Sequence, residues 1–520
     1  MKQEISIQTK LNTVTPYIAL IFLTFFTSLV LVSNPFSEVI AKHDSSMFTY
    51  FGYAMDNGKI MYTEIFDHKG PIIFILNYIG ILFSTTNFTG IYIIEFLSLF
   101  LFFLFTYRLS KLWIPDLTAF VPLIVEAIVL TFFLEGGNLT EEYALPFIAY
   151  SLYAFSKFYK SDNKIIWNEI ILIGMSFSVV FLLRANMISL WAIFCMFIVV
   201  EFIYKKEYKD LFKVIGLFII GVLLVFIPIG LYLYLNNALE AGIFQSLVFN
   251  FMYLDSSGEK NESMRMLYNI LSNHYVVALF SGFLLYVIYK WRNYTNNEKL
   301  LVIVALLFSI LSFYTSVMSG REYKHYLMAM VPTMTIPLIF IIKDLNMNIG
   351  KYKLFFSSCL VIFILYNSQL NTVYETIYIT NIDANEIEQA DGIDHKEQQM
   401  IYNATKKNRV LDIAKIIKEN SNKDDTIYVH RNAGNLYLLS DRLSSIKYFN
   451  LPAVDLNENK VIGENFLKEI IHADSKLIIL DTSFNNKEKF GTELNFYNFV
   501  LENYELIYNE NGYFVYSALK

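Results

Sequence analysis

Long apolar runs are the feature that most restricts how this chain can fold. Each run is about 18–22 residues long, the length that a helix needs to cross the hydrocarbon core of a bilayer. Inside lipid each backbone N–H and C=O group must bond within the protein, which favours helices. The hydrophobic fraction, 55%, exceeds the roughly 45–50% of soluble domains. We therefore predict a polytopic α-helical membrane protein with about eleven transmembrane helices. The predicted spans are residues 15–33, 90–108, 115–134, 142–160, 165–183, 187–204, 211–234, 273–290, 299–317, 327–342 and 353–370.

Lysine and arginine residues orient these spans, because cytoplasmic loops of membrane proteins are enriched in both. With the N-terminus in the cytoplasm, every predicted cytoplasmic segment is basic. The residues concerned are Arg108, Lys111, Lys157, Lys160, Lys164, Lys205, Lys206, Lys209, Lys290, Arg292, Lys299, Lys343, Lys351 and Lys353. No small-residue cleavage site follows the first apolar run, so we interpret that run as an anchor in the cell membrane. An odd number of spans then places everything after residue 370 on the outer side.

The first outer loop, residues 34–89, contains two shorter apolar segments. Residues 45–57 carry an apolar stripe at helical spacing and end at Gly58. Residues 71–83 begin with Pro71, which suits the first position of a helix. Both segments are too short to span a bilayer comfortably. We predict that both are helices lying in the outer membrane interface.

The C-terminal region has a different pattern and defines a second domain. We divide the chain into a membrane module, residues 1–370, and a soluble extracytoplasmic part, residues 371–520. The latter begins with a polar linker and continues as alternating helices and strands, which predicts a small α/β domain. The expected elements are helices at 404–420, 460–472 and 493–503, strands at 426–430 and 476–480, mixed elements at 433–449 and a hairpin-like pair at 504–518.

Charged residues on the predicted outer side break the positive-inside pattern and mark a candidate site. They stand in separate segments that all open on one face, so their side chains can converge. In the first outer loop they are His43, Asp44, Asp67, His68 and Lys69, accompanied by Tyr62; further along the chain they are Glu141, Glu142, Arg184, Arg321, Lys324 and His325, accompanied by Tyr326. Glu126 lies within a predicted span, where an acid usually has a partner or a function. The sequence does not name that partner.

The first-loop segments 43–48 (HDSSMF) and 67–71 (DHKGP) resemble the lipid-phosphate-sugar-dependent membrane glycosyltransferases of the GT-C fold. The likeness is greatest to the protein mannosyltransferase and aminoarabinose transferase type. In that family an acidic residue stands early in the first outer loop and a Lys-Pro-like motif follows before an apolar helix. The matching residues here are Asp44 and Lys69, with Gly70 inserted before Pro71, as in a bacterial variant of the motif. Weaker likeness covers 138–143 and 184–186, and the resemblance ends near residue 370.

This resemblance implies an inverting glycosyltransferase whose donor is a polyprenyl-phosphate-linked sugar. Such a reaction needs a base for the acceptor hydroxyl and cations for the departing phosphate. Asp44 is the candidate base, with Glu142 as a second catalytic candidate. Lys69 precedes a helix N-terminus that favours an anion, and Arg184 and Arg321 could form forked contacts with the same phosphate. The remaining residues of the candidate site are candidates for contact with substrate.

Each of these residues also has a purely structural interpretation. Asp44 could cap the helix 45–57, and Lys69 could extend its amine to the membrane interface. Arg184 could be an isolated charge at a tight turn, and the 321–325 group could contact lipid headgroups. Glu141 and Glu142 could be favourable acids at a helix N-terminus.

Two other functions fit a polytopic chain. One is a transporter or flippase of a lipid-linked glycan, although such proteins tend to show repeated halves and charges at the membrane midplane. The other is a structural membrane protein whose outer domain is the working part. Nothing suggests nucleic-acid binding, because the net charge is −6 and no basic stripe is present. The expected partners are the lipid-linked donor, membrane lipid, and a cell-envelope polymer, lipid or protein as acceptor. No cofactor is predicted, and a divalent metal ion near Asp44 and Glu142 stays open.

Overall fold

The structure is a computed structural model, and its elements fall into two compact units. The first unit comprises residues 1–31, 93–230 and 257–373, and the second comprises 32–92, 231–256 and 374–520. The structure describes residues 2–37, 40–41, 43–84, 88–161, 166–250, 282, 285–318, 323–348, 395–431, 434–451, 456–457 and 459–519.

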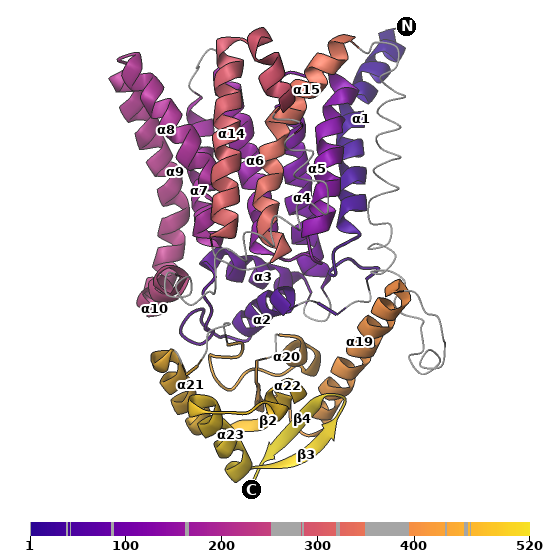
Figure 1. Cartoon of the computed structure of the whole chain (residues 1–520), viewed down its shortest axis with the longest axis vertical. Coiled ribbons are helices and arrows are strands. Elements are labelled where there is room, and N and C mark those ends of the chain that lie inside the picture. Colours follow the sequence, from indigo (N-terminus) through magenta and orange to yellow (C-terminus); the bar gives the residue numbers. More distant parts are fainter. Residues whose placement is uncertain are drawn as a thin grey trace. The chain divides into compact units, whose positions relative to one another are not determined.

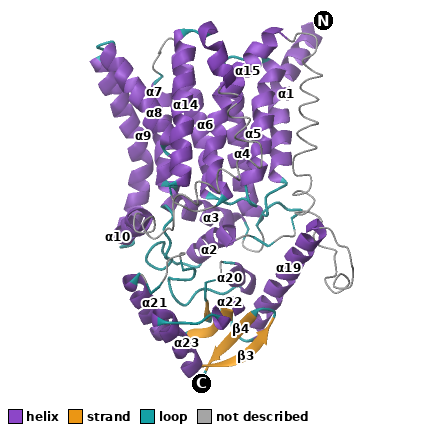
Figure 2. Cartoon of the chain, viewed as in Figure 1, coloured by secondary structure: helices purple, strands orange, loops and turns teal. Residues whose placement is uncertain are grey.

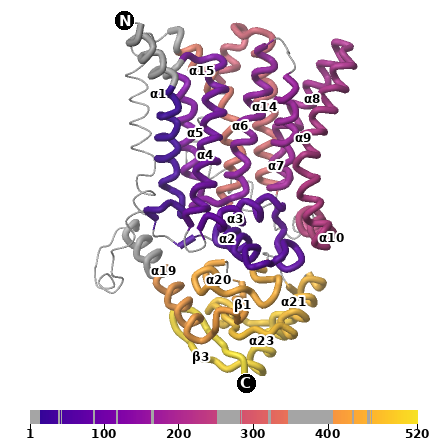
Figure 3. The backbone as a smooth tube through the Cα atoms, turned by 180° about the vertical axis from the view of Figure 1, so that it is seen from behind, coloured from indigo at the N-terminus to yellow at the C-terminus, as the bar shows by residue number. Residues whose placement is uncertain are grey.

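The first unit is a bundle of helices that run side by side (Figures 1 and 3). Its helices are α1 (Lys2–Ser28), α4 (Thr89–Ser110), α5 (Phe120–Phe133), α6 (Thr140–Lys160), α7 (Trp167–Leu183), α8 (Ser189–Tyr204), α9 (Tyr208–Leu235), α14 (Asn296–Val317) and α15 (Thr335–Asn348). Short 3-10 helices lie between them: η1 (Asp116–Ala119), η2 (Ala185–Met187), η4 (Trp291–Asn293) and η5 (Lys324–Met334).

Among the described residues, four helical segments are long and apolar enough to cross a membrane. They are 89–110, 208–235, 296–317 and 324–345, and shorter apolar helices accompany them. Helices occupy the predicted spans from 15–33 to 211–234, as well as 299–317 and 327–342. The span 353–370 and most of 273–290 fall outside the described residues. The prediction of a polytopic helical membrane protein is confirmed, whereas the number eleven stays a prediction.

Close packing within this bundle depends on glycine where α7 crosses α9. A Cβ atom on Gly174 would overlap the backbone carbonyl oxygen of Phe218, and one on Gly221 would overlap that of Ile171. The Ser178 hydroxyl also lies 3.4 Å from the carbonyl oxygen of Val222. In membranes, where lipid is as apolar as leucine, such small-residue contacts let helices gain dispersion energy at close range.

The second unit joins the first long loop to the C-terminal region. Its loop helices are α2 (His43–Asp56) and α3 (Pro71–Phe83), and α10 (Leu239–Ile243) continues into the π-helix η3 (Phe244–Val248). The two predicted loop helices are thus confirmed as helices. They pack tightly, because Gly52 of α2 admits the backbone of Asn77 and the rings of Phe51 and Phe74 stack with centroids 4.0 Å apart. Their position at a membrane interface stays a prediction.

The C-terminal region folds into the predicted small α/β arrangement (Figure 2). Its elements are α19 (His395–Glu419), β1 (Thr426–Val429), α20 (Asn435–Ser440), α21 (Lys460–His472), β2 (Ser475–Asp481), α22 (Thr482–Asn486), α23 (Gly491–Asn503), β3 (Tyr504–Glu510) and β4 (Tyr513–Ala518). The strand order is β1-β2-β4-β3, with β1 and β2 parallel and the other pairs antiparallel. Residues 477–480 of β2 are apolar and fully buried inside the sheet, and Phe466 of α21 and Phe496 of α23 pack on the sheet core.

Cysteine labelling tests the predicted placement of this region. In a cysteine-free background, we expect Glu505→Cys to react with an impermeant reagent added to intact cells, because residue 505 is exposed and predicted to be extracytoplasmic. Lys209→Cys, equally exposed but predicted to be cytoplasmic, is the control and should react only after the membrane is opened. The reverse labelling pattern would contradict the predicted orientation.

Candidate functional site

One group of predicted site residues gathers around Asp67 in the second unit. The Asp67 side chain is buried, with a residue exposure of 1%. Its Oδ1 accepts a hydrogen bond of 2.8 Å from the backbone N–H of Lys69, and its own N–H donates to Oε1 of Gln245 at 3.1 Å. A carboxylate that bonds to the backbone two residues later fixes a tight turn. This turn leads directly into α3.

Charges from both ends of the loop act on Asp67. Burial has the largest effect and raises the pKa of Asp67 above its ordinary value. The negative charge of Asp44 also raises this pKa, whereas the charge and backbone N–H of Lys69 and the charge of His43 lower it. Asp44 and Lys69, which are 25 positions apart in the sequence, therefore both lie near the same buried carboxyl group. His43 Nδ1 is 3.2 Å from Asp44 Oδ1. The structure thus brings together His43, Asp44, Asp67 and Lys69.

Lys69 stands just before the N-terminus of α3. Its Nζ lies 3.1 Å from Nε2 of His68 and 5.6 Å from the ring centroid of Phe48. Gly70 occupies the N-cap position without a side-chain cap, and Pro71 is the first helical residue. A helix N-terminus presents free N–H groups and a positive dipole end, and a neighbouring ammonium group adds a full charge. This arrangement is suited to binding an anion.

Tyr62 holds the turn from inside. It has φ 68°, a left-handed conformation that costs free energy for a residue with a side chain. Its hydroxyl donates to the carbonyl oxygen of Lys69 at 2.9 Å, and Nε2 of Gln245 donates to the carbonyl oxygen of Tyr62 at 2.7 Å. Asn250 donates similarly to His68 at 3.0 Å. Tyr62 is therefore a buried support of the turn that presents Lys69.

Gln245 and Asn250 were missed by sequence reasoning. They follow a long apolar helix, and their partners lie about 180 residues earlier in the chain. Gln245 belongs to the π-helix 244–248, and single π-turns are frequent at functional sites. A π-turn has no reliable pattern in a single sequence, so nothing there pointed to these two residues.

A second group of predicted residues meets in the first unit. The guanidinium group of Arg184 forms an ion pair with the Glu141 carboxylate and stacks on Tyr326, with Cζ 3.7 Å from the ring centroid. The hydroxyl of Thr140 donates to Glu141 at 2.8 Å. Burial alone would lower the pKa of Arg184, but Tyr326 and Glu141 raise it above its ordinary value, so the cation is held firmly. Arg184 is therefore a paired residue and not an isolated charge at a turn.

His325 joins the same region through an acid that the sequence analysis did not single out. Its Nδ1 lies 2.7 Å from Oε2 of Glu135. Glu135 is the first of four consecutive residues with left-handed φ angles, which are 46°, 98°, 86° and 55°. The second and third of these residues are Gly136 and Gly137, and the first and last have side chains. Backbone in this region is held against strain by its surroundings.

Glu95 of α4 is the buried residue that holds this run. Its carboxylate accepts a hydrogen bond from the backbone N–H of Asn138 and leaves no room for a Cβ atom on Gly137. The fully buried carboxyl group of Glu142 lies beside it. The Asn138 side chain in turn accepts a bond of 2.9 Å from the Tyr143 hydroxyl. In the sequence, Glu95 could be noticed only as an acidic residue within the predicted span 90–108.

Four further predicted residues remain, of which the structure describes three. Glu142 is fully buried beside Glu95, and Lys324 is exposed at the start of η5. Arg321 falls outside the described residues. Glu126, whose partner the sequence did not reveal, accepts a hydrogen bond from the hydroxyl group of Thr335. In the described part of the chain, no three His, Cys, Asp or Glu side chains are grouped so as to hold a metal ion.

The family model described as "Putative competence-induced protein Ccs4 N-terminal domain" matches residues 5–354. The chain belongs to this family. No curated protein matches this member of the Ccs4 family.

Solved structures show which fold this Ccs4 family member has. ArnT from Cupriavidus metallidurans bound to undecaprenyl phosphate superposes with a TM-score of 0.60 at 11% sequence identity, covering 98% of each chain. The apo form of the same protein gives 0.58 at 10% identity with the same coverage. The Archaeoglobus fulgidus oligosaccharyltransferase in complex with Zn and sulfate gives 0.46 at 13% identity, covering 96% of this chain and 73% of that one. The likeness to ArnT confirms the GT-C-like fold that the first-loop motif predicted.

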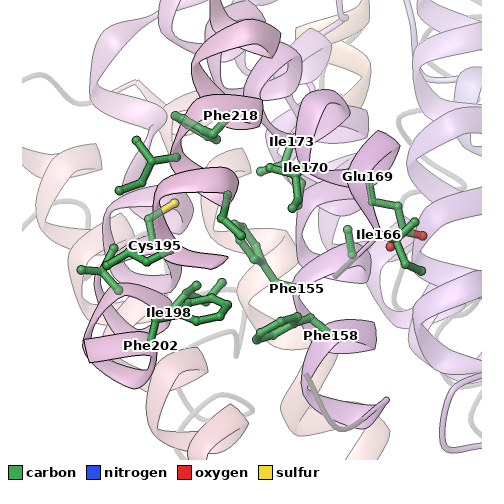
Figure 4. A pocket seen from close by; sticks show the side chains of 15 residues that line it. Phe155, Phe158, Ile166, Glu169, Ile170, Ile173, Cys195, Ile198, Phe202 and Phe218 are labelled. Carbon is green, nitrogen blue, oxygen red and sulfur yellow. The ribbon is translucent and has the colours of Figure 1, made fainter. Parts of the chain in front are cut away.

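The Ccs4 family member also has an apolar cavity of about 160 Å³ in its first unit (Figure 4). The cavity lies between α6, α7, α8 and α9, and side chains such as Phe155, Ile170 and Phe218 line it. Glu169 is its one acidic lining residue and forms an ion pair with Lys157 at 2.6 Å. None of the predicted site residues lines this cavity.

Proposed function

We propose that this protein is a glycosyltransferase that moves a sugar from a polyprenyl-phosphate carrier to an acceptor at the outer face of the membrane. The observation that carries the proposal is the cluster of Asp44, in the first turn of α2, with Asp67 and Lys69, which lie just before α3. It combines a carboxylate, a cation and a helix N-terminus in a chain with the fold of ArnT. That relative was solved bound to undecaprenyl phosphate, a lipid of the proposed donor class.

In this proposal Asp44 is the general base. Its side chain is 32% exposed, so an acceptor hydroxyl can reach it, whereas Asp67 is buried and shapes the turn. The oxygen of the acceptor attacks the anomeric carbon as its proton passes to Asp44, and the bond from that carbon to the carrier phosphate breaks. A single displacement of this kind inverts the anomeric centre. Glu142 is proposed as a second candidate acid or base, because its buried carboxyl group lies beside that of Glu95.

The departing phosphate is assigned to Lys69 and the N–H groups that begin α3. These groups carry positive charge where negative charge accumulates in the transition state. Arg184 and Arg321 are proposed as further phosphate ligands. The proposed substrate contacts are His43, His68, Lys324 and Tyr326, supported by the buried residues Tyr62, Asp67, Glu141 and His325. The acceptor is a cell-envelope polymer, a lipid or a protein. Residues 1–370 form the transferase module, with the N-terminus in the cytoplasm, and 371–520 an extracytoplasmic part.

Substitution of Lys69 tests the phosphate site. We expect Lys69→Ala to weaken binding of undecaprenyl phosphate about 10–100-fold, because a hydrogen bond to a charged group contributes roughly 1.5–3 kcal/mol. Lys69→Arg should retain part of the affinity, since it keeps the charge. The measurement is a titration of the detergent-solubilised protein with undecaprenyl phosphate, alongside its transfer rate.

Lys59→Ala is the matched control for this titration. Lys59 lies in the same loop, but its Nζ pairs with Glu64 at 3.2 Å and both side chains are about a third exposed. An exposed ion pair of this kind contributes little to stability, so Lys59→Ala should bind undecaprenyl phosphate as the wild type does. Equal affinities in wild type, Lys59→Ala and Lys69→Ala would remove Lys69 from the site.

A further inference from the structure

The C-terminal part of the second unit contacts the first long loop beside the residues that form the charged cluster. Just before Asp44, the carbonyl oxygen of Ala41 accepts a hydrogen bond of 2.8 Å from Nδ2 of Asn435. Just before Asp67, the N–H of Phe66 donates to the carbonyl oxygen of Lys447 at 3.0 Å. Segments 434–451 and 41–66 are thus joined close to both halves of the cluster (Figures 1 and 3).

Between these two points, α2 lies directly against the C-terminal segment. Gly434 precedes α20, and a Cβ atom there would overlap the carbonyl oxygen of Ser46 in the first turn of α2. Gly434 has φ −64° and ψ −17°, a helical conformation that any residue can adopt. The glycine is therefore required by the close approach of α2 and not by its backbone angles.

Tyrosine residues extend this contact along α2. The hydroxyl oxygen of Tyr50 accepts a hydrogen bond of 2.8 Å from the N–H of Ser444, and the Tyr53 hydroxyl donates to Oδ1 of Asp441 at 2.8 Å. The Tyr50 ring packs against both Tyr437 and Phe449, with centroid distances of 4.9 and 4.3 Å. Tyr50 is buried, so separating the two segments would leave its hydroxyl group and the N–H of Ser444 without a hydrogen bond, at a cost in free energy.

We infer that residues 434–449 are a positioning element for the transfer site. They hold α2 and the 66–69 turn at a fixed separation, and so set the distance between Asp44 and Lys69. The expected effect on the transfer rate rests on the proposed function, whereas the expected effect on the conformation of the loop does not. The segment acts through the loop, so its residues are positioning residues that need not touch substrate.

A pair of glycine substitutions separates this role from simple destabilisation of the C-terminal part. Gly434→Ala forces α2 away from the segment. Gly463→Ala creates the same kind of overlap, with the carbonyl oxygen of Leu456, but between α21 and a neighbouring loop. A displacement of about 1 Å can cost 10²-fold in rate. We expect kcat to fall by up to about that factor in Gly434→Ala and by less than about twofold in Gly463→Ala.

A double-substitution cycle with Asp44→Asn shows whether Gly434 acts through α2. If it does, Gly434→Ala should lower the residual rate of Asp44→Asn by much less than it lowers the wild-type rate, because coupled residues are not additive. Tyr50→Phe is a milder second variant that keeps the ring and removes only the hydroxyl bond to Ser444. Equal proportional losses in both backgrounds would overturn the inference.

Amide hydrogen exchange tests the same inference without substrate. Gly434→Ala and Tyr50→Phe should speed exchange in residues 43–50 and leave α23 unchanged, whereas Gly463→Ala should speed exchange around α21 and α23 and leave 43–50 unchanged. Unchanged exchange at 43–50 in both Gly434→Ala and Tyr50→Phe would overturn the inference whatever the enzyme does. If the exchange result holds but wild-type protein transfers no sugar, the proposed function fails and the positioning of the loop stands.

Discussion

Asp44→Asn should fold and bind undecaprenyl phosphate like the wild type, yet transfer sugar about 10²–10⁴-fold more slowly. Asparagine keeps the shape of the side chain but cannot take a proton from the acceptor hydroxyl. Asp44 lies in the first turn of α2, one residue after the helix begins at His43. An acid in that position contributes only about 0.3–1 kcal/mol to helix stability, far less than the barrier change expected for a base. The measurement pairs a thermal midpoint with a transfer rate in one preparation.

Asp56→Asn provides the control on the same helix. Asp56 is the exposed last residue of α2 and lies outside the charged cluster. Removing an acid from a helix C-terminus is neutral or slightly favourable for stability, so both the thermal midpoint and the rate should stay near wild type. A folded Asp44→Asn protein that binds undecaprenyl phosphate and transfers sugar at the wild-type rate would leave Asp44 with a helix-stabilising role only.

Arg184→Ala should cost about 3–5 kcal/mol of stability, because it leaves the Glu141 carboxylate buried without its ion-pair partner. The Glu141 side chain is 2% exposed and that of Arg184 is 18% exposed. The Tyr326 ring loses its cation at the same time. The thermal midpoint of the detergent-solubilised protein measures this loss. Addition of Glu141→Gln to Arg184→Ala should recover part of it, since no buried charge then remains.

Lys157→Ala is the comparison for this effect. The Lys157–Glu169 pair is also in direct contact, at 2.6 Å, but its side chains are 31% and 21% exposed. Water can solvate Glu169 once the lysine is removed, so a loss of about 1 kcal/mol or less is expected. If Arg184→Ala and Lys157→Ala lower the thermal midpoint equally, the burial of the Arg184 pair does not govern its contribution.

Most of what could be predicted about the fold came from sequence patterns within a few neighbouring residues. The helices at 43–56 and 71–83 and the C-terminal strands follow from apolar periodicity, Pro71 and turn residues, which act over a few positions. The GT-C-like fold followed from the first-loop motif, because the family places its acid and its lysine at a characteristic spacing. The number of spans did not follow as firmly, since predicted spans such as 353–370 fall outside the described residues.

The pairing of site residues was harder to predict, because it depends on contacts between distant parts of the chain. Arg184 looked like an isolated charge, and only the tertiary fold brings it to Glu141, 43 positions earlier. Glu95 and Gln245 each appear as one polar residue near an apolar run, which indicates burial but names no partner. The contact of Gly434 with Ser46 joins residues that are far apart in the chain, and no sequence pattern predicted it. One sequence can therefore suggest which residues matter without showing what they touch.

The left-handed run at 135–138 has a consequence for how the chain is made. Glu95 belongs to a strongly apolar helix, and α4 precedes Asn138 and Glu142 along the chain, so it reaches the membrane ahead of them. An acid within an inserting helix opposes insertion, by up to roughly 2.5–3.5 kcal/mol at the helix centre, and the surrounding phenylalanine and leucine residues of α4 must outweigh this cost. The turn closes only after α6 has arrived, and His325 reaches Glu135 later still. Insertion of this protein therefore ends with an assembly step, in which a polar network forms among helices already in the membrane.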